Sequence, residues 1–355
     1  MKATFTILLL AACLWVAASC KPASPDANLI VADSVRVVTT FVSANALSVK
    51  SSPATITALA FDPSGNLYVT DYAHRLVRRV TPAGLVSTFA GTGEEGYRNG
   101  PAASAQFGNL VSMACDKAGN MYVGEGFNNT CIRRITPDGI VSTFAGKPFS
   151  LKKLPFTPDT SPDGRDTTAR FIAPVALGFD SSDNLFVSDV GSINRYSSDA
   201  IRKITPDGYV RAIAGHASGL AYQGQVSADI PQPWRFTSLA VNQADDAVAV
   251  DRGNRLLYQI TPTGDVSLFL NTRSFTTPQA LLFDPAGNLL VAELTRIWRI
   301  SPGKQLVTLT GSDQRGFVND SLRTARFSYI SALALDKQGT LYIADQGSIR
   351  RIRFN

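Results

Sequence analysis

The sequence predicts an all-β fold, a six-bladed β-propeller whose last blade is completed by a strand from the N-terminal end. Three observations lead to this prediction. A unit built around two turn motifs recurs six times, with some copies incomplete. Each unit contains short stretches rich in Val, Ile, Phe and Tyr, which favour β-strands. The sixth unit ends after its third strand, and residues 37–41 resemble the strand that it lacks.

The repeating unit begins with an Asp-x-x-Gly-Asn turn, followed by a strand of the Leu-Tyr-Val type. A strand with two basic residues, a Thr-Pro-x-Gly turn and a fourth strand complete it. Gly and Asn adopt positive φ at low cost and Pro presets φ, so both motifs predict tight turns. The units start near residues 62, 116, 180, 242, 284 and 336. Four strands in about 40–50 residues are typical of a propeller blade.

These units resemble NHL repeats, and the resemblance covers roughly residues 36–355. It rests on the two turn motifs occurring together in order, as at residues 62–66 and 81–84. The resemblance implies a six-bladed NHL propeller over residues 36–355, in which the N-terminal strand completes the last blade. Closure of this kind removes exposed sheet edges.

The N-terminal segment has the features of an export signal. Lys2 precedes an apolar stretch from residue 5 to residue 18, which is too short for a membrane span. The stretch ends in Ala-Ala-Ser-Cys, which resembles the lipobox of bacterial lipoproteins. That resemblance implies a lipoprotein signal peptide over residues 1–19, an acylated Cys20, a lipid anchor and linker over residues 20–35, and, from Lys21, an outer-membrane location. The alternative is an ordinary cleavage site beside an incidental cysteine.

Length differences between the units fall mainly on one face of the predicted ring. Both recurring turns lie on what we call the bottom face. The loops between second and third strands, and those between blades, lie on the opposite, top face. The insertions occupy residues 91–110, 146–174, 189–200, 215–235 and 311–329. Variable loops on a rigid scaffold often carry binding sites, although they are also where neutral drift is tolerated.

Large aromatic residues in these loops are candidates for ligand binding. Tyr97 and Phe317 recur within a Gly-rich linker that ends in Ala-x-Phe, so we expect them to pack in the scaffold. Residues 91–96 of that linker match Gly-x-Gly-x-x-Gly, but no βαβ unit follows, so we interpret the motif as structural. The better ligand-binding candidates lie in unmatched insertions: Tyr196, Tyr222 and Trp234.

An acidic residue ends the second strand of every unit: Asp71, Glu125, Asp189, Asp251, Glu293 and Asp345. Together these carboxylates could form a ring that holds calcium, because hard cations prefer oxygen ligands. Alternatively, each accepts hydrogen bonds from its own turn or pairs with a cation of the third strand. Presence in every unit favours the second interpretation, because a metal site needs only some of the copies.

The net charge of +6 raises the question of nucleic-acid binding. Nine Lys or Arg residues, however, occupy equivalent positions in the third strands around the ring, as Arg78 and Arg79 do. We therefore expect scaffold salt bridges and no nucleic-acid partner. His74 and His216 stand alone, without an evident nucleophile or metal-ligand partner, so no catalytic residue is assigned. Cys115 and Cys131 are separated by an intervening strand, which predicts two buried free thiols.

Two functions of different classes follow from these features. The sequence favours a non-enzymatic scaffold, anchored in the bacterial cell envelope, whose top-face loops bind a protein or a glycan. The alternative is an enzyme, because six-bladed propellers of this type include metal-dependent lactonases and streptogramin-type lyases. No cofactor is expected, apart from calcium if the acidic ring binds a metal. The expected partners are the lipid bilayer, through acylated Cys20, and an unidentified protein or glycan.

Overall fold

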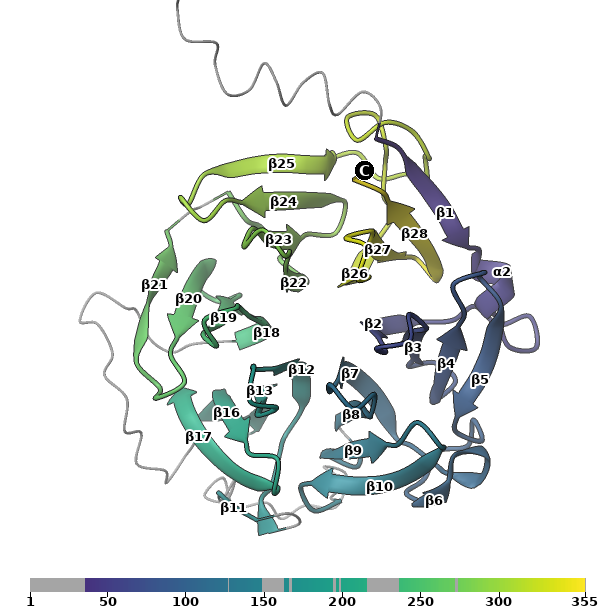
Figure 1. The fold of residues 1–355 in the computed structure, drawn as a ribbon, viewed down its shortest axis with the longest axis vertical. Helices are drawn as coiled ribbons and strands as arrows, with labels where there is room; N and C mark the ends of the chain where they lie inside the picture. Colours follow the sequence, from purple (N-terminus) through teal and green to yellow (C-terminus); the bar gives the residue numbers. More distant parts are fainter. Residues whose placement is uncertain are drawn as a thin grey trace, which may run out of the picture.

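The computed structural model describes residues 36–126, 128–148, 163–165, 168–193, 196–197, 199–215, 236–271 and 274–354. Within them, six antiparallel sheets stand as blades around a central axis (Figure 1). The prediction of an all-β six-bladed propeller is confirmed. The predicted signal peptide, Cys20 and the linker lie outside the described residues. No helix in the described part of the chain has the length and apolar character needed to cross a bilayer.

Each blade has four strands, which we call a to d from the axis outward. Blade 1 contains β2 (Ile56–Phe61), β3 (Leu67–Asp71), β4 (Leu76–Val80) and β5 (Val86–Ala90). Blade 2 contains β7 (Asn109–Cys115), β8 (Met121–Gly126), β9 (Cys131–Ile135) and β10 (Ile140–Ala145), with β6 (Gly100–Pro101) and the 3-10 turn η1 (Ala102–Ser104) outside it. Blade 3 contains β12 (Pro174–Phe179), β13 (Leu185–Asp189), β16 (Ala200–Ile204) and β17 (Tyr209–Gly215), with β11 (Gly164–Arg165) outside β17.

Blades 4 and 5 have the same order of strands. Blade 4 contains β18 (Phe236–Val241), β19 (Ala247–Asp251), β20 (Leu256–Ile260) and β21 (Val266–Leu270). Blade 5 contains β22 (Ala280–Phe283), β23 (Leu289–Ala292), β24 (Arg296–Ile300) and β25 (Leu306–Gly311). A separate small hairpin, β14 (Ser192–Ile193) with β15 (Tyr196–Ser197), lies in the connection between strands b and c of blade 3.

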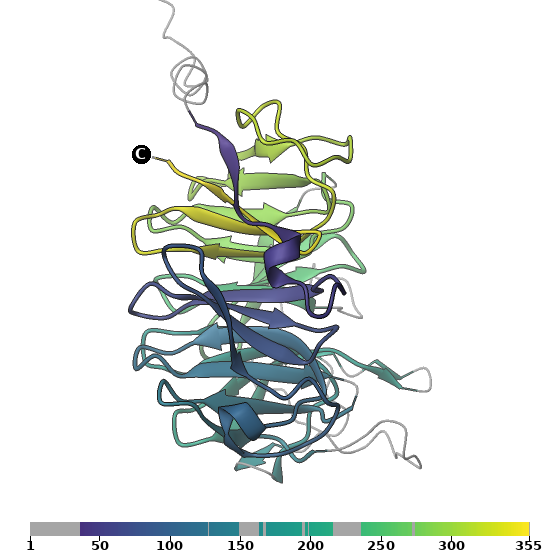
Figure 2. The same cartoon turned by 90° about the vertical axis from the view of Figure 1, so that its right-hand side faces the viewer.

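Blade 6 joins the two ends of the chain. Its strands a to c are β26 (Ile330–Leu335), β27 (Leu341–Asp345) and β28 (Ser348–Ile352), and its strand d is β1 (Val38–Val42). Val38 lies opposite Ile352, and both side chains are buried in one apolar cluster. The purple β1 starts on the side of the disc where the chain ends and runs toward α2 (Ala44–Leu47) (Figure 2). Closure of the ring by the N-terminal strand, as predicted, is confirmed.

The recurring turns owe their shape to local hydrogen bonds. Asp62 accepts hydrogen bonds from the backbone N and the side-chain Nδ2 of Asn66, both at 2.8 Å. Gly65, between them, has a φ of 84°, which a residue with a Cβ atom adopts only with strain. Asp116 and Asn120 repeat the same pair of bonds in blade 2. These short turns close the bottom face and leave the longer connections on the other side.

Apolar side chains fill the contacts between neighbouring blades. Leu59 and Val69 of blade 1, for example, are buried in one cluster with Ala332 and Tyr342 of blade 6. Burial of apolar surface contributes about 25 cal/mol per Å². Because each blade is buried against both neighbours, the ring positions its top-face loops rigidly.

The two described cysteines are free thiols, as predicted. Cys131 is buried, whereas Cys115 is only half-buried, so the prediction of burial is right for one of them. Burial raises the pKa of Cys115 to about 12. Because the thiolate is the reactive form, this thiol is a poor nucleophile at neutral pH.

The linkers that lead into blades 2 and 6 depart from the sequence-based expectation, because they do not stay on the top face. We call residues 91–109 the blade-2 linker and residues 311–329 the blade-6 linker. In the first, β6 pairs with Ile140 and Val141 at the outer edge of β10. In the second, Asp320 O accepts a hydrogen bond from Val38 N at 2.8 Å. The outermost strands would otherwise expose unpaired backbone groups, and the linkers cover them.

Candidate functional site

The six acidic residues at the ends of the b strands are all buried, with at most 7% of any one exposed. Most of them accept hydrogen bonds from backbone N–H groups of the linker that leads into their own blade. Asp345 Oδ1, for example, accepts from Ser328 N at 2.9 Å and from Tyr329 N at 2.8 Å. Each such carboxylate therefore fixes the point where the chain turns into strand a.

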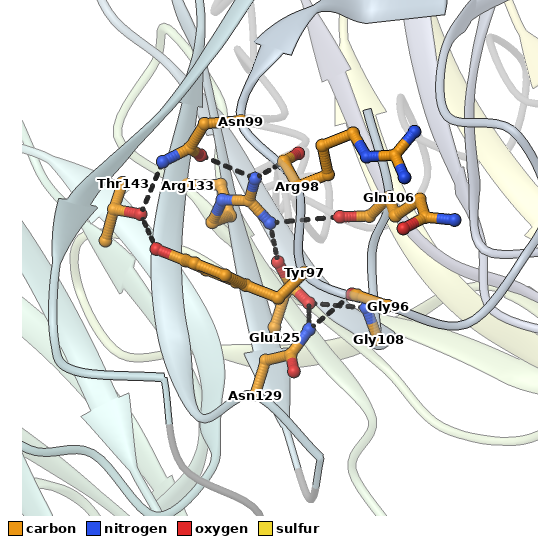
Figure 3. Close-up of polar contacts among 10 residues, drawn as sticks. All are labelled: Gly96, Tyr97, Arg98, Asn99, Gln106, Gly108, Glu125, Asn129, Arg133 and Thr143. Atoms are coloured by element: carbon orange, nitrogen blue, oxygen red, sulfur yellow. Dashed lines mark hydrogen bonds and ion pairs between the residues drawn. The ribbon is translucent and has the colours of Figure 1, made fainter. Parts of the chain in front are cut away.

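In blade 2 the carboxylate also binds an arginine that holds the linker (Figure 3). Arg133 Nη1 donates to Glu125 Oε1 at 2.6 Å and to Gln106 O at 3.2 Å. Its Nη2 donates to Arg98 O at 2.9 Å and to Asn99 Oδ1 at 2.7 Å. The side chains of Arg133 and Glu125 are both fully buried. We call this arrangement the arginine clamp.

Blade 6 repeats the arginine clamp at matching positions. Arg350 Nη1 donates to Asp345 Oδ2 at 3.0 Å, and the guanidinium also donates to the carbonyl oxygens of Arg326 and Val318. In both blades the guanidinium lies over two aromatic rings of the linker, with its carbon 4.4–5.2 Å from their centres: Tyr97 and Phe107 in blade 2, Phe317 and Phe327 in blade 6. Tyr97 and Phe317 thus pack in the scaffold, as predicted.

Blade 3 keeps the arginine, and blades 1, 4 and 5 use other donors. Arg202 of blade 3 donates to Arg170 O and lies 3.6 Å from Asp189 Oδ2. In the other three blades a 2.7 Å contact joins His74 Nδ1 to Asp71 Oδ2, Asn254 Nδ2 to Asp251 Oδ2, and Trp298 Nε1 to Glu293 Oε2. The six carboxylates therefore take part in six separate scaffold networks, which fits the structural interpretation of the repeated acid.

The surroundings shift the pKa of two of these carboxyl groups, those of Glu125 and Glu293, in opposite directions. Burial raises the pKa of Glu125, although the charge of Arg133 opposes the shift. At Glu293 burial acts in the same direction, but hydrogen bonds from Trp298 and two linker threonines outweigh it and lower the pKa below its usual value. Within the described ranges, no three or more His, Cys, Asp or Glu side chains form a group that could hold a metal ion. Calcium at the acidic ring stays a prediction.

The three aromatic residues predicted to bind ligand are not placed by the structure. Tyr196 lies in β15 of the small hairpin, where the backbone alone is described. Tyr222 and Trp234 lie outside the described residues. Their role stays a prediction.

A hollow of about 820 Å³, which we call the rim hollow, opens between blades 6 and 1. The turn between β27 and β28, the loop before β2 and the blade-6 linker line it, which places it on the top face. Tyr329 is one of its lining residues and is 43% exposed. Arg315, Gln346 and Thr55 are exposed beside it. The hollow thus combines an aromatic surface with guanidinium, amide and hydroxyl groups.

Sequence reasoning missed Tyr329 because it is the last residue of a linker whose recurring motif predicts a scaffold role. The sequence nevertheless contains a signal, because Tyr329 departs from the repeat. The blade-2 linker has the same length and carries Asn109 at the matching position. An aromatic residue that breaks the repeat is a stronger candidate than one that keeps it.

The central channel offers different chemistry. A hollow of about 320 Å³ there is lined by residues of all six a strands. Its lining side chains are apolar or carry hydroxyl or amide groups, such as Thr57, Val111, Gln279 and Ser331, and none of them is ionisable. These residues can make apolar contacts and hydrogen bonds but cannot transfer protons near neutral pH.

Comparison with known proteins places the chain among propellers with diverse activities. No protein-family model matches it. It is 26% identical to Teneurin-3 of Mus musculus over 406 aligned positions, covering 92% of this chain and 14% of that protein. For Teneurin-3 of Danio rerio the identity is 27% over 363 positions, covering 92% and 12%. The chain thus spans 12–14% of the length of these relatives.

The structural neighbours include binding proteins, lactonases and lyases. An auxiliary nutrient binding protein from Bacteroides thetaiotaomicron has a TM-score of 0.60 at 12% identity, covering 90% of this chain and 76% of that chain. A gluconolactonase from Xanthomonas campestris has a TM-score of 0.59 at 12% identity, covering 91% and 92%. Virginiamycin B lyase from Staphylococcus aureus has a TM-score of 0.53 at 16% identity, covering 86% and 82%. The chain is a six-bladed β-propeller with NHL-like and teneurin-like homologues.

Proposed function

We propose that the protein is an exported lipoprotein of the bacterial outer membrane whose top face binds a glycan. The observation that carries the proposal is the rim hollow, where the exposed Tyr329 lies beside Arg315 and Gln346. A sugar ring has an apolar C–H face and an edge of hydroxyl groups. An aromatic ring packs against the face, while amide and guanidinium groups hydrogen-bond to the edge.

The rim hollow is held in place before any ligand arrives. Tyr329 N donates to Asp345 Oδ1 at 2.8 Å, and Tyr329 O accepts from Gln346 N at 3.0 Å. In the linker, Gly316 N donates to Phe327 O at 3.1 Å. A preformed site loses little conformational entropy on binding, which favours affinity. The similarity to a nutrient binding protein supports the same class of function.

The proposal is tested by calorimetric titration of the purified protein with a panel of plant, animal and bacterial oligosaccharides. We expect at least one to bind, and we expect Tyr329→Asn to weaken it tenfold or more. Asn is the residue of the blade-2 linker at this position, so the substitution suits the backbone. Tyr209→Ala is the matched control, because Tyr209 is also 43% exposed but follows a bottom turn. Equal binding by Tyr329→Asn and the parent would overturn the site assignment.

The same titrations apply to the aromatic residues of the insertions. Alanine at Tyr196, Tyr222 or Trp234 is expected to weaken binding if these insertions reach the ligand in the rim hollow. Unchanged affinity in all three variants would remove them from the site and leave the hollow as the binding surface.

The proposed anchor is tested separately with a radiolabelled fatty acid in cells. We expect the label on the parent protein in the outer-membrane fraction and none on Cys20→Ser. Labelling of Cys20→Ser at the parent level would contradict acylation at this residue.

A second candidate function is a metal-dependent lactonase or lyase. The observation that favours it is the fold shared with a gluconolactonase and with virginiamycin B lyase. Metal analysis of the purified protein, followed by assays on gluconolactone and on streptogramin B, distinguishes it from a binding protein. Turnover that depends on bound calcium and falls in a Glu293→Gln variant would favour the enzyme.

A further inference from the structure

We propose that the glycan is acidic and that the blade-6 linker carries a second subsite for its carboxylate, on the side opposite Tyr329. This inference rests on the proposed function and adds the class of ligand. A second hollow, of about 790 Å³, is lined by the other side of the blade-6 linker and by the start of β24. Arg323 and Arg326 lie in it, and we call it the arginine hollow.

The guanidinium groups around this linker are available for a ligand. Arg315, Arg323 and Arg326 are exposed, and no described residue forms an ion pair with any of them. A guanidinium binds a carboxylate through two parallel N–H···O bonds, which makes arginine suited to this group.

The arginine hollow also contains groups that are already paired or that oppose an anion. Arg296 forms an ion pair with Asp313 at 2.8 Å, which leaves little net charge on that pair. Asp320 also lines the hollow, and its carboxylate accepts a hydrogen bond from Ser321 N at 2.7 Å. The hollow therefore holds two unpaired guanidinium groups, those of Arg323 and Arg326, against the single carboxylate of Asp320, and this balance of +1 favours an anionic ligand.

The blade-2 linker shows that these arginines are not needed for the scaffold. The two linkers have equal length and share the clamp, both aromatic rings and the Ala-x-Phe ending. Where the blade-6 linker has Arg315, Arg323 and Arg326, the blade-2 linker has Glu95, Ala103 and Gln106. Glu95 is satisfied within the protein, because it pairs with Arg75 at 3.0 Å and accepts from Asn128 at 2.8 Å. At this matching position the blade-2 linker thus uses its charge within the fold, whereas Arg315 of the blade-6 linker is exposed.

The two hollows adjoin where Gly316 contacts Arg326, so a ligand that spans this contact would reach both. Gly316 lines the rim hollow and Arg326 lines the arginine hollow. A Cβ atom added to Gly316 would lie only 3.3 Å from the Arg326 side chain. A sugar ring against Tyr329 therefore places its neighbour or its own acidic substituent across Gly316, toward Arg323 and Arg326.

The experiment compares tri-galacturonate with its neutral counterpart galactotriose, by calorimetric titration of the purified protein. The variants Arg323→Ala and Arg326→Gln carry the residues of the blade-2 linker, so they preserve the clamp. We expect each to weaken tri-galacturonate binding about tenfold or more, and to leave galactotriose binding unchanged. The matched control is Arg98→Val, which removes an exposed arginine of the blade-2 linker and introduces the residue of the blade-6 linker.

Three results would overturn the inference, and they are distinguishable. If galactotriose binds with Tyr329 dependence but tri-galacturonate binds no better and ignores both arginine variants, the acidic subsite is wrong while the proposed function stands. If neither trisaccharide nor any other member of the panel binds, the proposed function fails as well. If acetate or sulfate alone binds as tightly as tri-galacturonate, the arginine hollow is a general anion site and not part of a glycan site.

Discussion

The blade-2 and blade-6 linkers show how one piece of scaffold can serve two purposes. Both are held by a buried arginine of strand c, which lies over two aromatic rings and donates hydrogen bonds to linker carbonyl groups. They differ at the exposed positions, where Glu95 in the first is replaced by Arg315 in the second. Repetition thus marks the residues that the fold requires, and departures from the repeat mark the residues available for binding.

The largest effect is expected from removal of the clamp in either linker. Arg133→Met leaves Glu125 buried without its cation, and Arg350→Met does the same to Asp345. Breaking one partner of a buried ion pair costs about 3–5 kcal/mol. Urea unfolding should show losses of this size in both variants, against a change within about 0.5 kcal/mol for the exposed control Arg98→Val. A loss below about 1 kcal/mol in both would refute a scaffold role for the clamp.

The next largest loss of stability is expected from substitution of the first residue of each linker. Gly91 and Gly311 have φ values of 107° and 84°, and a Cβ atom there would meet the backbone oxygen of Arg75 or Thr295. We expect Gly91→Ala and Gly311→Ala to lower the free energy of unfolding by about 1–3 kcal/mol each. The contact is closer at Gly311, so its loss should be the greater, as measured by thermal unfolding. A greater loss for Gly91→Ala would show that the blade-6 linker accommodates an added Cβ atom more easily than the blade-2 linker does.

A smaller effect is expected at the aromatic residue of each clamp. The Tyr97 hydroxyl forms a hydrogen bond with Thr143 Oγ1, and Thr40 holds the position that matches Thr143 in blade 6. Tyr97→Phe should therefore cost about 0.5–1.5 kcal/mol. Phe317→Tyr should recover part of that amount in blade 6. Equal stability of all three proteins would mean that the hydroxyl is satisfied by water in both places.

The smallest effect concerns pH and extends the comparison to blade 5, where Trp298 replaces the arginine. Hydrogen bonds lower the pKa of Glu293 below its unfolded value of about 4.5. A lowered pKa means that the stabilisation is present above the unfolded pKa and is lost as the pH falls through the folded pKa. The stability difference between the parent and Glu293→Gln should therefore shrink between pH 6 and pH 3. Burial raises the pKa of Glu125, so Glu125→Gln should not show this shrinkage.

The fold could be predicted from the sequence because its determinants are local and repeated. Asp62, Gly65 and Asn66 make one turn by themselves, and the same spacing recurs in other blades. Ring closure could be predicted as well, because residues 37–41 match a strand that the last unit lacks.

The candidate site could be predicted only in part, because it forms where segments far apart in sequence meet. Thr55 precedes blade 1 and Tyr329 precedes blade 6, and the sequence does not indicate that they border one hollow. The descent of the linkers along the outer strands was missed for a related reason. It satisfies backbone groups of strand d, and backbone pairing of this kind leaves no mark on residue type.

The direction of β1 determines the face of the ring at which a tether would be attached. Arg36, just before β1, lies beside the bottom turn at Asp284 and Pro285, so the chain joins the ring at its bottom face. A lipid on Cys20 would be separated from it by 16 residues, a reach of at most about 55 Å. Tension on such a tether would load β1 along its own length, so that its hydrogen bonds to β28 resist together in shear and do not peel apart one by one.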